Sequence, residues 1–190
     1  MMNEQTAQQI AEYRQEIAAL RQKIRTARAG VGAEPVRDYV FAAPGGSVRL
    51  VDLFGGRSDL ILIHNMGSSC PYCTLWADGF NGVYGHLENR AAFVVTSPDP
   101  PETQQRFAEG RGWRFPMVSH RDTSFAADMG YRASDGDFLP GVSIFRRDGD
   151  RVLRVSDAGF SPGDDFCALW HIFAMLPDGA GTWRPKFQYG

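Results

Sequence analysis

The stretch "LILIHNMGSSCPYC", residues 60–73, decides the fold of this 190-residue chain. Its first part, "LILIH", is a continuous apolar run of strand length, which is typical of a strand buried on both faces. Cys70 and Cys73 follow it, separated by two residues, and lead into a segment with a helical pattern. A cysteine pair at a strand-to-helix junction indicates an α/β fold and thiol chemistry.

The helix after this strand is predicted to begin near Cys70. Cys70 would be the N-cap and Pro71 the first helical residue, where the N–H that proline lacks is not needed. The free N–H groups and the positive end of the helix dipole would then stabilise a thiolate at Cys70. Cys73 lies one turn further on, within reach of that sulfur. We therefore predict that Cys70 is the nucleophile and Cys73 the resolving thiol.

Residues 1–35 are predicted to be a separate N-terminal segment, with one helix over residues 3–29. Its apolar side chains recur at spacings of three and four, which form a narrow stripe: Ile10, Tyr13, Ile17, Leu20, Ile24 and Ala27. The stripe is shorter than a free coiled coil requires. We expect it to contact a second subunit in a homodimer in preference to its own domain, although the sequence alone leaves both open.

Residues 36–190 are predicted to form one domain that ends in an irregular tail from about residue 177. Turn residues between extended runs indicate two hairpins, and helical patterns alternate with the remaining strands. The predicted elements are a hairpin over 38–50, strands at 60–64, 91–97 and 115–119, helices from the cap Asp99 to Gly110, over 122–129 and over 162–176, and a hairpin over 141–156. This order predicts a mixed α/β sheet flanked by helices, with parallel middle strands.

The composition excludes several classes of protein. A formal net charge of −2 gives no reason to expect nucleic acid as a partner. No apolar run approaches the roughly 18 residues of a membrane span, and the N-terminus lacks a signal-peptide pattern. We therefore expect a cytoplasmic protein. Three cysteines do not make a structural disulfide framework, and no cofactor is expected.

These motifs resemble those of a known superfamily. "CPYC" after a buried strand is similar to the motif of thioredoxins and glutaredoxins. The segments "CPYCTLWADGFNG", "GWRFPMVS" and "WRPKFQY" look like a bacterial thioredoxin-like family without an established function, whose relatives are often labelled peroxiredoxin-like. The resemblance covers the chain from about Val36 onward. It implies a thioredoxin-like fold and a thiol–disulfide oxidoreductase, which acts on a protein or small-molecule disulfide and is regenerated by an external thiol reductant.

The resemblance also implies roles for two further residues. Pro140 precedes "GVSIF" as the cis-proline of thioredoxins precedes a strand, so it is expected to be cis and to face Cys70. His64 stands six residues before Cys70, where thioredoxins carry a buried acid that accepts the proton of the second cysteine. A neutral imidazole could do the same for Cys73 near neutral pH. The alternative is a buried histidine that bonds to the backbone.

Three other functions stay open. A peroxidase would use Cys73 as the peroxidatic residue, but the peroxiredoxin pattern P-x-x-x-T/S-x-x-C then places Met66 and Cys70 where proline and threonine or serine are needed. A zinc site could combine Cys70 and Cys73 with Cys167 and His171. A catalytically silent protein could bind a partner through its N-terminal helix.

The other candidate residues have structural interpretations. Trp76 and Phe80 are predicted to pack in the core, and Asp78 to be a solvated helix charge or a bond to a neighbouring loop. Cys167 is predicted to be a buried packing residue. His120 is assigned to the surface or a loop.

Overall fold

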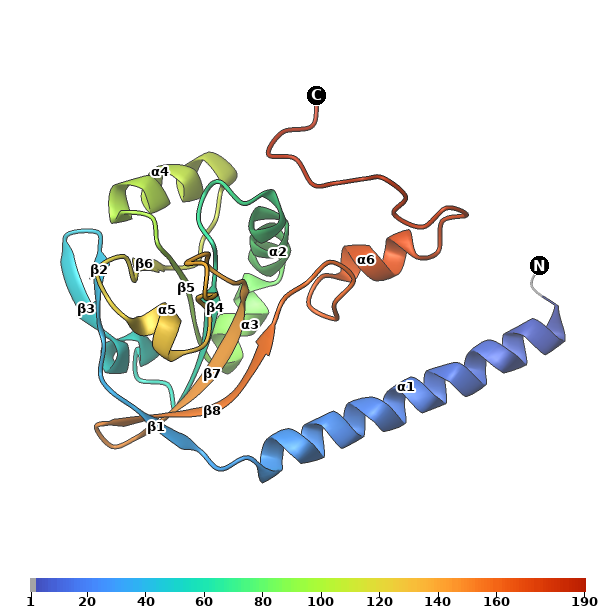
Figure 1. Ribbon diagram of the computed structural model, residues 1–190, viewed down its shortest axis with the longest axis horizontal. Coiled ribbons are helices and arrows are strands. Elements are labelled where there is room, and N and C mark those ends of the chain that lie inside the picture. The colour runs from blue at the N-terminus through green and yellow to red at the C-terminus, as the bar shows by residue number, and fades with distance from the viewer. Residues whose placement is uncertain (1–2) are drawn as a thin grey trace.

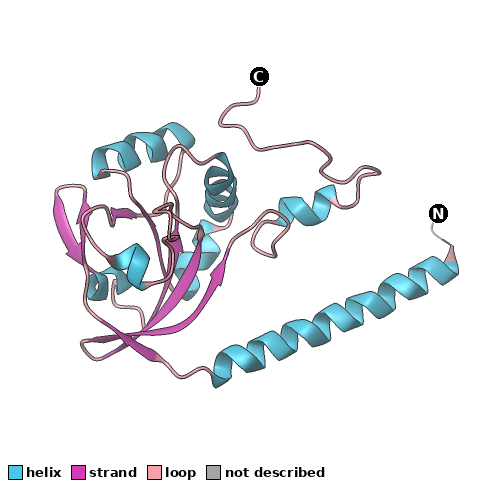
Figure 2. Cartoon of the chain, viewed as in Figure 1, coloured by secondary structure: helices cyan, strands magenta, loops and turns pink. Residues whose placement is uncertain are grey.

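The computed structural model describes residues 3–190, so Met1 and Met2 lie outside the described part of the predicted segment 1–35. One eight-stranded mixed sheet forms the centre, and helices lie on both of its faces (Figures 1 and 2). This arrangement confirms the predicted fold class. Within residues 3–190, no helix has the length and hydropathy that a membrane span requires.

The three middle strands run parallel, and every other neighbouring pair is antiparallel. The sheet has the order β1-β8-β7-β4-β5-β6-β2-β3. The strands are β1 Glu34–Val36, β2 Val40–Ala43, β3 Gly46–Arg49, β4 Asp59–His64, β5 Ala92–Ser97, β6 Met117–Ser119, β7 Gly141–Asp148 and β8 Arg151–Gly159. Both predicted hairpins are confirmed, whereas β1 was not predicted from the sequence.

The helices enclose the sheet on two sides. They are α1 Glu4–Gly30, the 3-10 helix η1 Leu50–Phe54, α2 Pro71–Gly82, α3 Tyr84–Arg90, α4 Pro101–Arg111, α5 Phe125–Asp128 and α6 Ala168–Phe173. Side chains of α2 and α3 pack on one face of the sheet, and those of η1 and α5 pack on the other. The long helix α1 extends away from this body (Figure 1).

The side chains of β4 alternate between two separate hydrophobic cores. Leu60 and Leu62 pack on the side of Phe125 in α5, whereas Ile63 packs on the side of Trp76 in α2. Successive residues of a strand point to opposite faces, so the parity of a position along β4 decides which helices it meets. His64, two residues after Leu62, therefore lies on the same face of the sheet as Leu62.

The last predicted helix is much shorter than expected. It begins at Ala168 instead of residue 162, because the carboxylate of Asp164 accepts hydrogen bonds from the backbone N–H groups of Ser161 and Phe166 and holds a turn there. Gly163 has a positive φ of 92°, which a helix does not allow. The segment 161–167 is therefore a loop.

Two other predicted helix starts were also wrong. Pro100, and not Asp99, is the N-cap of α4, because the Asp99 carboxylate bonds to a different loop. The short helix α5 begins at Phe125 instead of residue 122, after a turn in which the Thr123 hydroxyl donates to the His120 carbonyl.

A close approach at Gly141 gives the first prediction. An added Cβ there would overlap the Tyr131 ring and lie 2.6 Å from the Ala158 carbonyl oxygen, so we expect Gly141→Ala to lower the free energy of unfolding. The loss should be about 3 kcal/mol in chemical denaturation, as overpacking against backbone cannot relax freely. Gly159 pairs with Gly141 in register and has open space, which makes Gly159→Ala the matched control. Equal stability of the two variants would contradict this packing.

Candidate active site

The two cysteines occupy the first turn of α2, as the sequence predicted. Cys70 is the N-cap in an extended conformation, and Pro71 is the first helical residue. The Cys70 sulfur accepts a hydrogen bond from the Cys73 N–H at 3.1 Å. Both thiols are free, and Cys70 is partly exposed whereas Cys73 is 3% exposed. The accessible sulfur is therefore the one at the positive end of the helix.

The two thiols differ sharply in acidity. Hydrogen bonds from the Cys73 thiol and from the backbone N–H groups of Cys73 and Tyr72 lower the pKa of Cys70 to about 7. The pKa of Cys73 is raised far above its ordinary value, first by its bond to the Cys70 sulfur, then by burial and by the negative charge on Cys70. At neutral pH about half of the Cys70 thiols are therefore ionised, and the negative charge of the pair resides on Cys70.

Asp99 fixes the loop that delivers Cys70, a role that the sequence did not reveal. Its carboxylate accepts a hydrogen bond of 2.7 Å from the Ser68 N–H. An added Cβ at Gly67 would lie 3.2 Å from this carboxylate, and Gly67 has a positive φ of 111°. The Asn65 side chain closes the turn by accepting from the Gly67 N–H at 2.8 Å. The sequence signal was an aspartate two residues after a buried strand.

His64 lies on the face of the sheet away from α2. Its ring stacks on Tyr131 and on Phe125, the α5 residue of the opposite core, and its Nε2 is 2.9 Å from the Ser143 hydroxyl. Cys73 is not among its bonding partners. Because His64 stands two residues after Leu62 along β4, the two share a face of the sheet, and the ring points away from the helix that carries the cysteines. The prediction that His64 accepts the Cys73 proton is therefore wrong in this geometry, and the partner of the buried ring is a serine instead of the backbone.

The bond between Leu139 and Pro140 is trans, so the expected cis-proline is wrong. Trans is the ordinary state of an X-Pro bond. In this state the Leu139 N–H donates to the Tyr131 carbonyl, and the Pro140 carbonyl accepts from the Phe160 N–H. Pro140 directly precedes Gly141, which pairs with His64 at the end of β4, where the loop to Cys70 departs. That Pro140 faces Cys70 stays a prediction.

Polar side chains in the second half of α2 bond to the end of α4 and to the loop that follows it. Asp78 forms an ion pair with Arg111 and accepts from the Trp113 indole N–H at 2.8 Å. Arg111 also donates to the Phe187 carbonyl at 2.9 Å, which anchors the C-terminal tail. Asn81 accepts from the Arg114 N–H at 2.9 Å. Asp78 of α2 therefore bonds to a neighbouring loop, one of the two predicted alternatives, and these contacts connect the segments "WADGFNG" and "GWRFP" with the tail.

Core packing accounts for the next aromatic residues, as predicted. Trp76 is 3% exposed, and its indole N–H donates to Asp164 at 3.3 Å. Phe80 packs on Phe93 and Phe160.

A groove lies beside the cysteine motif. Tyr72, the residue between Pro71 and Cys73, stacks on Trp170, and Trp183 meets Trp170 edge to face. These rings and Arg184 line a groove of about 610 Å³, whose other wall is the glycine-rich segment 179–182. The volume lies in the range of small-molecule sites.

The predicted zinc ligands do not come together. Across residues 3–190, no group of three or more histidine, cysteine or acidic side chains is placed to hold a metal ion. Cys167 is 7% exposed, packs in the core on the α2 side and has a pKa raised by burial. His171 is exposed and lies 3.4 Å from Asp165. The packing interpretation of Cys167 agrees with this placement, and the zinc alternative has no support.

His120 lies in the loop directly after β6, one of the two places to which the sequence assigned it, but it is buried instead of exposed. It is 3% exposed at the end of β6, its ring lies against Phe138, and burial lowers its pKa to about 4. Burial, together with the neighbouring His120 and Arg154, also lowers the pKa of His64 well below its usual value. At neutral pH two buried, neutral imidazoles therefore lie at the carboxyl ends of β4 and β6.

A dithiol on the first turn of the helix after a central parallel strand, with one acidic and one buried thiol, defines a thioredoxin-like α/β protein with a thiol redox site. The chain belongs to a family of bacterial proteins of unknown function, DUF899, which matches residues 3–188. No curated protein sequence matches the chain.

Several solved structures share the fold. Peroxidoxin BcpB from Mycobacterium tuberculosis is 28% identical with a TM-score of 0.55, covering 68% of this chain and 86% of its own. A PrxQ mutant from Xylella fastidiosa is 15% identical with a TM-score of 0.58, over 69% and 87% of the two chains. A peroxiredoxin-like protein from Aquifex aeolicus is 16% identical with a TM-score of 0.53, over 67% and 74%. These similarities confirm the thioredoxin-like fold.

The acidity of the pair gives the second prediction. Because the pKa of Cys70 is about 7, alkylation of Cys70 should reach half its maximal rate near pH 7. At pH 5 the rate should be about 100-fold below that maximum. Cys73 and Cys167, which are buried and less acidic, should stay unmodified in the folded protein. Mass spectrometry of each cysteine after timed alkylation measures this. A Cys73 that reacts first would contradict the geometry.

The buried histidines give the third prediction. Below about pH 6.5 the unfolded chain binds protons that the folded chain does not, so the free energy of unfolding should fall as the pH falls. For His120, with a folded pKa of about 4, the loss from pH 6.5 to 4 is about 3 kcal/mol. Urea denaturation of His120→Gln should show a shallower pH dependence. The exposed His86 provides the control, since His86→Gln should keep the slope of the original chain.

Proposed function

We propose that this protein is a thiol–disulfide oxidoreductase in which Cys70 is the nucleophile and Cys73 the resolving thiol. The observation that carries this proposal is the hydrogen bond from the Cys73 N–H to the Cys70 sulfur, together with the pKa of about 7 at Cys70. A partly exposed thiolate at neutral pH is the species that attacks disulfides. The buried second thiol one turn away is placed to complete the exchange.

The first step uses the charge on Cys70. Its thiolate attacks one sulfur of a substrate disulfide, which forms a mixed disulfide and releases the other substrate sulfur as a thiolate. The free N–H groups of Tyr72 and Cys73 supported the negative charge before the attack and are released from it afterwards. One half of the substrate has then left, and Cys70 is covalently bound to the other half.

The second step depends on the loss of that charge. The bond to Cys70 and the negative charge on Cys70 are the first and third causes of the high pKa of Cys73. Both disappear when Cys70 enters the mixed disulfide, so Cys73 becomes more acidic at the stage when its thiolate is needed. That thiolate then attacks the Cys70 sulfur, releases the second substrate thiolate and leaves a Cys70–Cys73 disulfide. An external thiol reductant restores the dithiol.

The substrate would be a protein or small-molecule disulfide. The groove beside Tyr72 offers aromatic side chains and Arg184 for contacts close to the cysteine motif. A direction of reaction toward reduction agrees with the cytoplasmic setting that we expect from the sequence. Neither nucleic acid nor a membrane is part of this proposal.

A second candidate is a thiol peroxidase, and the names of the similar structures favour it. Peroxidoxin BcpB is 28% identical to this chain. In that reaction Cys73 would attack a peroxide, be oxidised to sulfenic acid and release an alcohol or water, and Cys70 would condense with it to a disulfide and water. The raised pKa and 3% exposure of Cys73 weigh against this assignment.

Two single variants test the roles of the cysteines, in a Cys167→Ala background that removes the third thiol. With oxidised glutathione as the disulfide, Cys73→Ser should accumulate a mixed disulfide at Cys70, because no resolving thiol remains. Cys70→Ser should form none. Intact-mass spectrometry reads both results, and circular dichroism checks that each variant is folded.

Hydrogen peroxide discriminates the second candidate. Sulfenic acid at Cys73 in the Cys70→Ser variant, formed faster than the mixed disulfide in the Cys73→Ser variant, would establish the peroxidase and overturn the reductase. Thiols that react with neither reagent in folded protein would overturn both and leave a silent thioredoxin-like scaffold.

A further inference from the structure

The helix α1 presents an uncovered apolar stripe. None of the 27 residues of α1 is buried. The large side chains of the predicted stripe are about half exposed: Tyr13 52%, Ile17 47%, Leu20 56% and Ile24 49%. Hydrophobic side chains at heptad spacing on an otherwise polar helix are typical of a helix–helix interface. A single helix in water with this stripe exposed lacks the packing that stabilises most helices in proteins.

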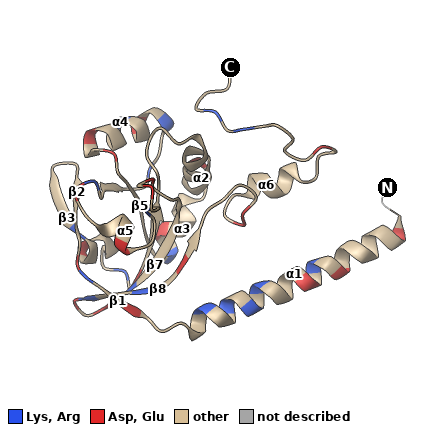
Figure 3. Ribbon diagram, in the orientation of Figure 1, with Lys and Arg blue, Asp and Glu red and all other residues tan. Residues whose placement is uncertain are grey.

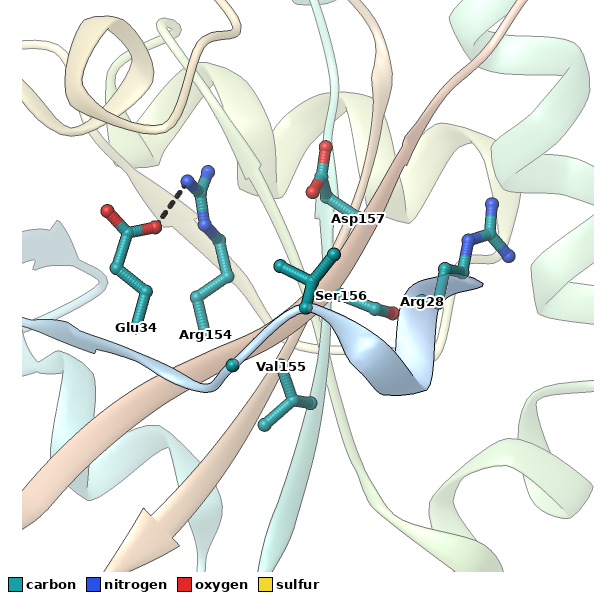
Figure 4. Close-up of a pocket in the computed structure, with 8 residues that line it drawn as sticks. Arg28, Glu34, Arg154, Val155, Ser156 and Asp157 are labelled. Carbon is teal, nitrogen blue, oxygen red and sulfur yellow. Dashed lines mark hydrogen bonds and ion pairs between the residues drawn. The ribbon is translucent and has the colours of Figure 1, made fainter. Parts of the chain in front are cut away.

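The second half of α1 is connected to the domain by an exposed ion pair, which does not involve the apolar stripe. Arg21 forms an ion pair of 2.7 Å with Asp165 in the loop before α6. At the end of the helix, Arg28 borders a pocket of about 270 Å³, which β8 closes and next to which Glu34 and Arg154 form an ion pair of 2.6 Å (Figure 4). The ion pair between Arg21 and Asp165 is polar and exposed, and it leaves the apolar side of the helix uncovered.

The charges of α1 are divided between its two halves (Figure 3). Residues 4–16 carry three acidic side chains and one basic: Glu4, Glu12, Glu16 and Arg14. Residues 17–30 carry no acidic side chain and four basic ones: Arg21, Lys23, Arg25 and Arg28. Two such helices side by side in parallel would place the basic halves together, whereas an antiparallel pair would place each acidic half against a basic half.

We propose that α1 pairs with α1 of a second copy of this chain in an antiparallel two-helix interface. Charge complementarity of the two halves favours this occupant and this direction. The helix dipoles favour it as well, because opposite ends then adjoin. The proposal concerns assembly and does not depend on the chemistry of Cys70.

The sizes of the stripe residues fit this direction. With the centre of the pair between Ile17 and Leu20, those two residues face each other across the interface. Tyr13 then meets Ile24, and Ile10 meets the small Ala27, so large side chains face smaller ones. A parallel pair would place Tyr13 against its own copy and Ala27 against its own copy, which crowds one layer and leaves a gap in another.

The flanking charges fit as well. Beside the stripe, Glu16 of one helix comes next to Lys23 of the other, and the two-fold symmetry makes this contact twice. The same geometry brings Arg14 near Arg21 of the partner helix. Arg21 is already neutralised by Asp165 of its own chain, which reduces that repulsion.

The mass in solution tests the interface. In sedimentation equilibrium at micromolar concentration, the full chain should have twice its monomer mass of 21.1 kDa. A Leu20→Gln/Ile24→Gln double variant should be a monomer, because glutamine removes the apolar contact but remains a good helix former. Circular dichroism should show that its helix content is retained. A wild-type chain that stays monomeric at about 100 micromolar would overturn the proposal.

Charge reversal at one position tests the direction. In the antiparallel pair Lys23→Glu sets two carboxylates against each other, its own and that of Glu16, and should weaken dimerisation about tenfold. Combining Glu16→Lys with Lys23→Glu should restore the dimer, because the pair then has opposite charges again. In a parallel pair Lys23 would face Arg28, so Lys23→Glu would strengthen the dimer and overturn the antiparallel assignment. Arg25→Glu changes the same charge away from the stripe. This control should shift the dissociation constant less than Lys23→Glu does.

Discussion

The hydrogen bond from the Cys73 N–H to the Cys70 sulfur is the constraint on which the site depends. A helix N-terminus leaves N–H groups without partners inside the helix, and one of them is satisfied here by a sulfur atom. The bond exists only if the chain enters α2 with Cys70 extended, and this entry is fixed by the loop 65–69. Asp99 holds the loop from outside and Asn65 from within. The low pKa of Cys70, to which the Cys73 thiol contributes most, therefore also depends on the loop that brings the sulfur to this N–H group.

The second half of α2 is likewise positioned by a carboxylate, that of Asp78. Asp78 binds Arg111 and Trp113, and through Arg111 it reaches the tail at Phe187. The tail in turn supplies Trp183 and Arg184 to the groove beside Tyr72. One partly buried carboxylate therefore connects the helix of the cysteines to the segment that shapes their surroundings. The three sequence motifs that mark the family are, in structural terms, the partners in this network.

Patterns with a local cause were predictable from the sequence. The apolar run of β4, the proline after Cys70 and the glycine turns of both hairpins act within a few residues, and the structure has them as predicted. The errors have non-local causes. Asp99 resembles a helix cap but bonds to Ser68, and Asp164 converts a predicted helix into a loop by bonding to Ser161, Phe166 and Trp76. No spacing along the chain reveals such partners.

His64 shows how a resemblance can give the right position and the wrong face. The residue stands at the end of β4, where the resemblance places a proton acceptor, yet its parity directs it to Tyr131 and Ser143. Within residues 3–190, Cys73 consequently has no acidic or basic side chain bonded to it other than Cys70. The control of its acidity then falls to the charge on Cys70, which suppresses the second thiolate while the first is present and ceases to do so once Cys70 is bound to a substrate. Two thiols one turn apart can order their own reactions in this way without a third residue.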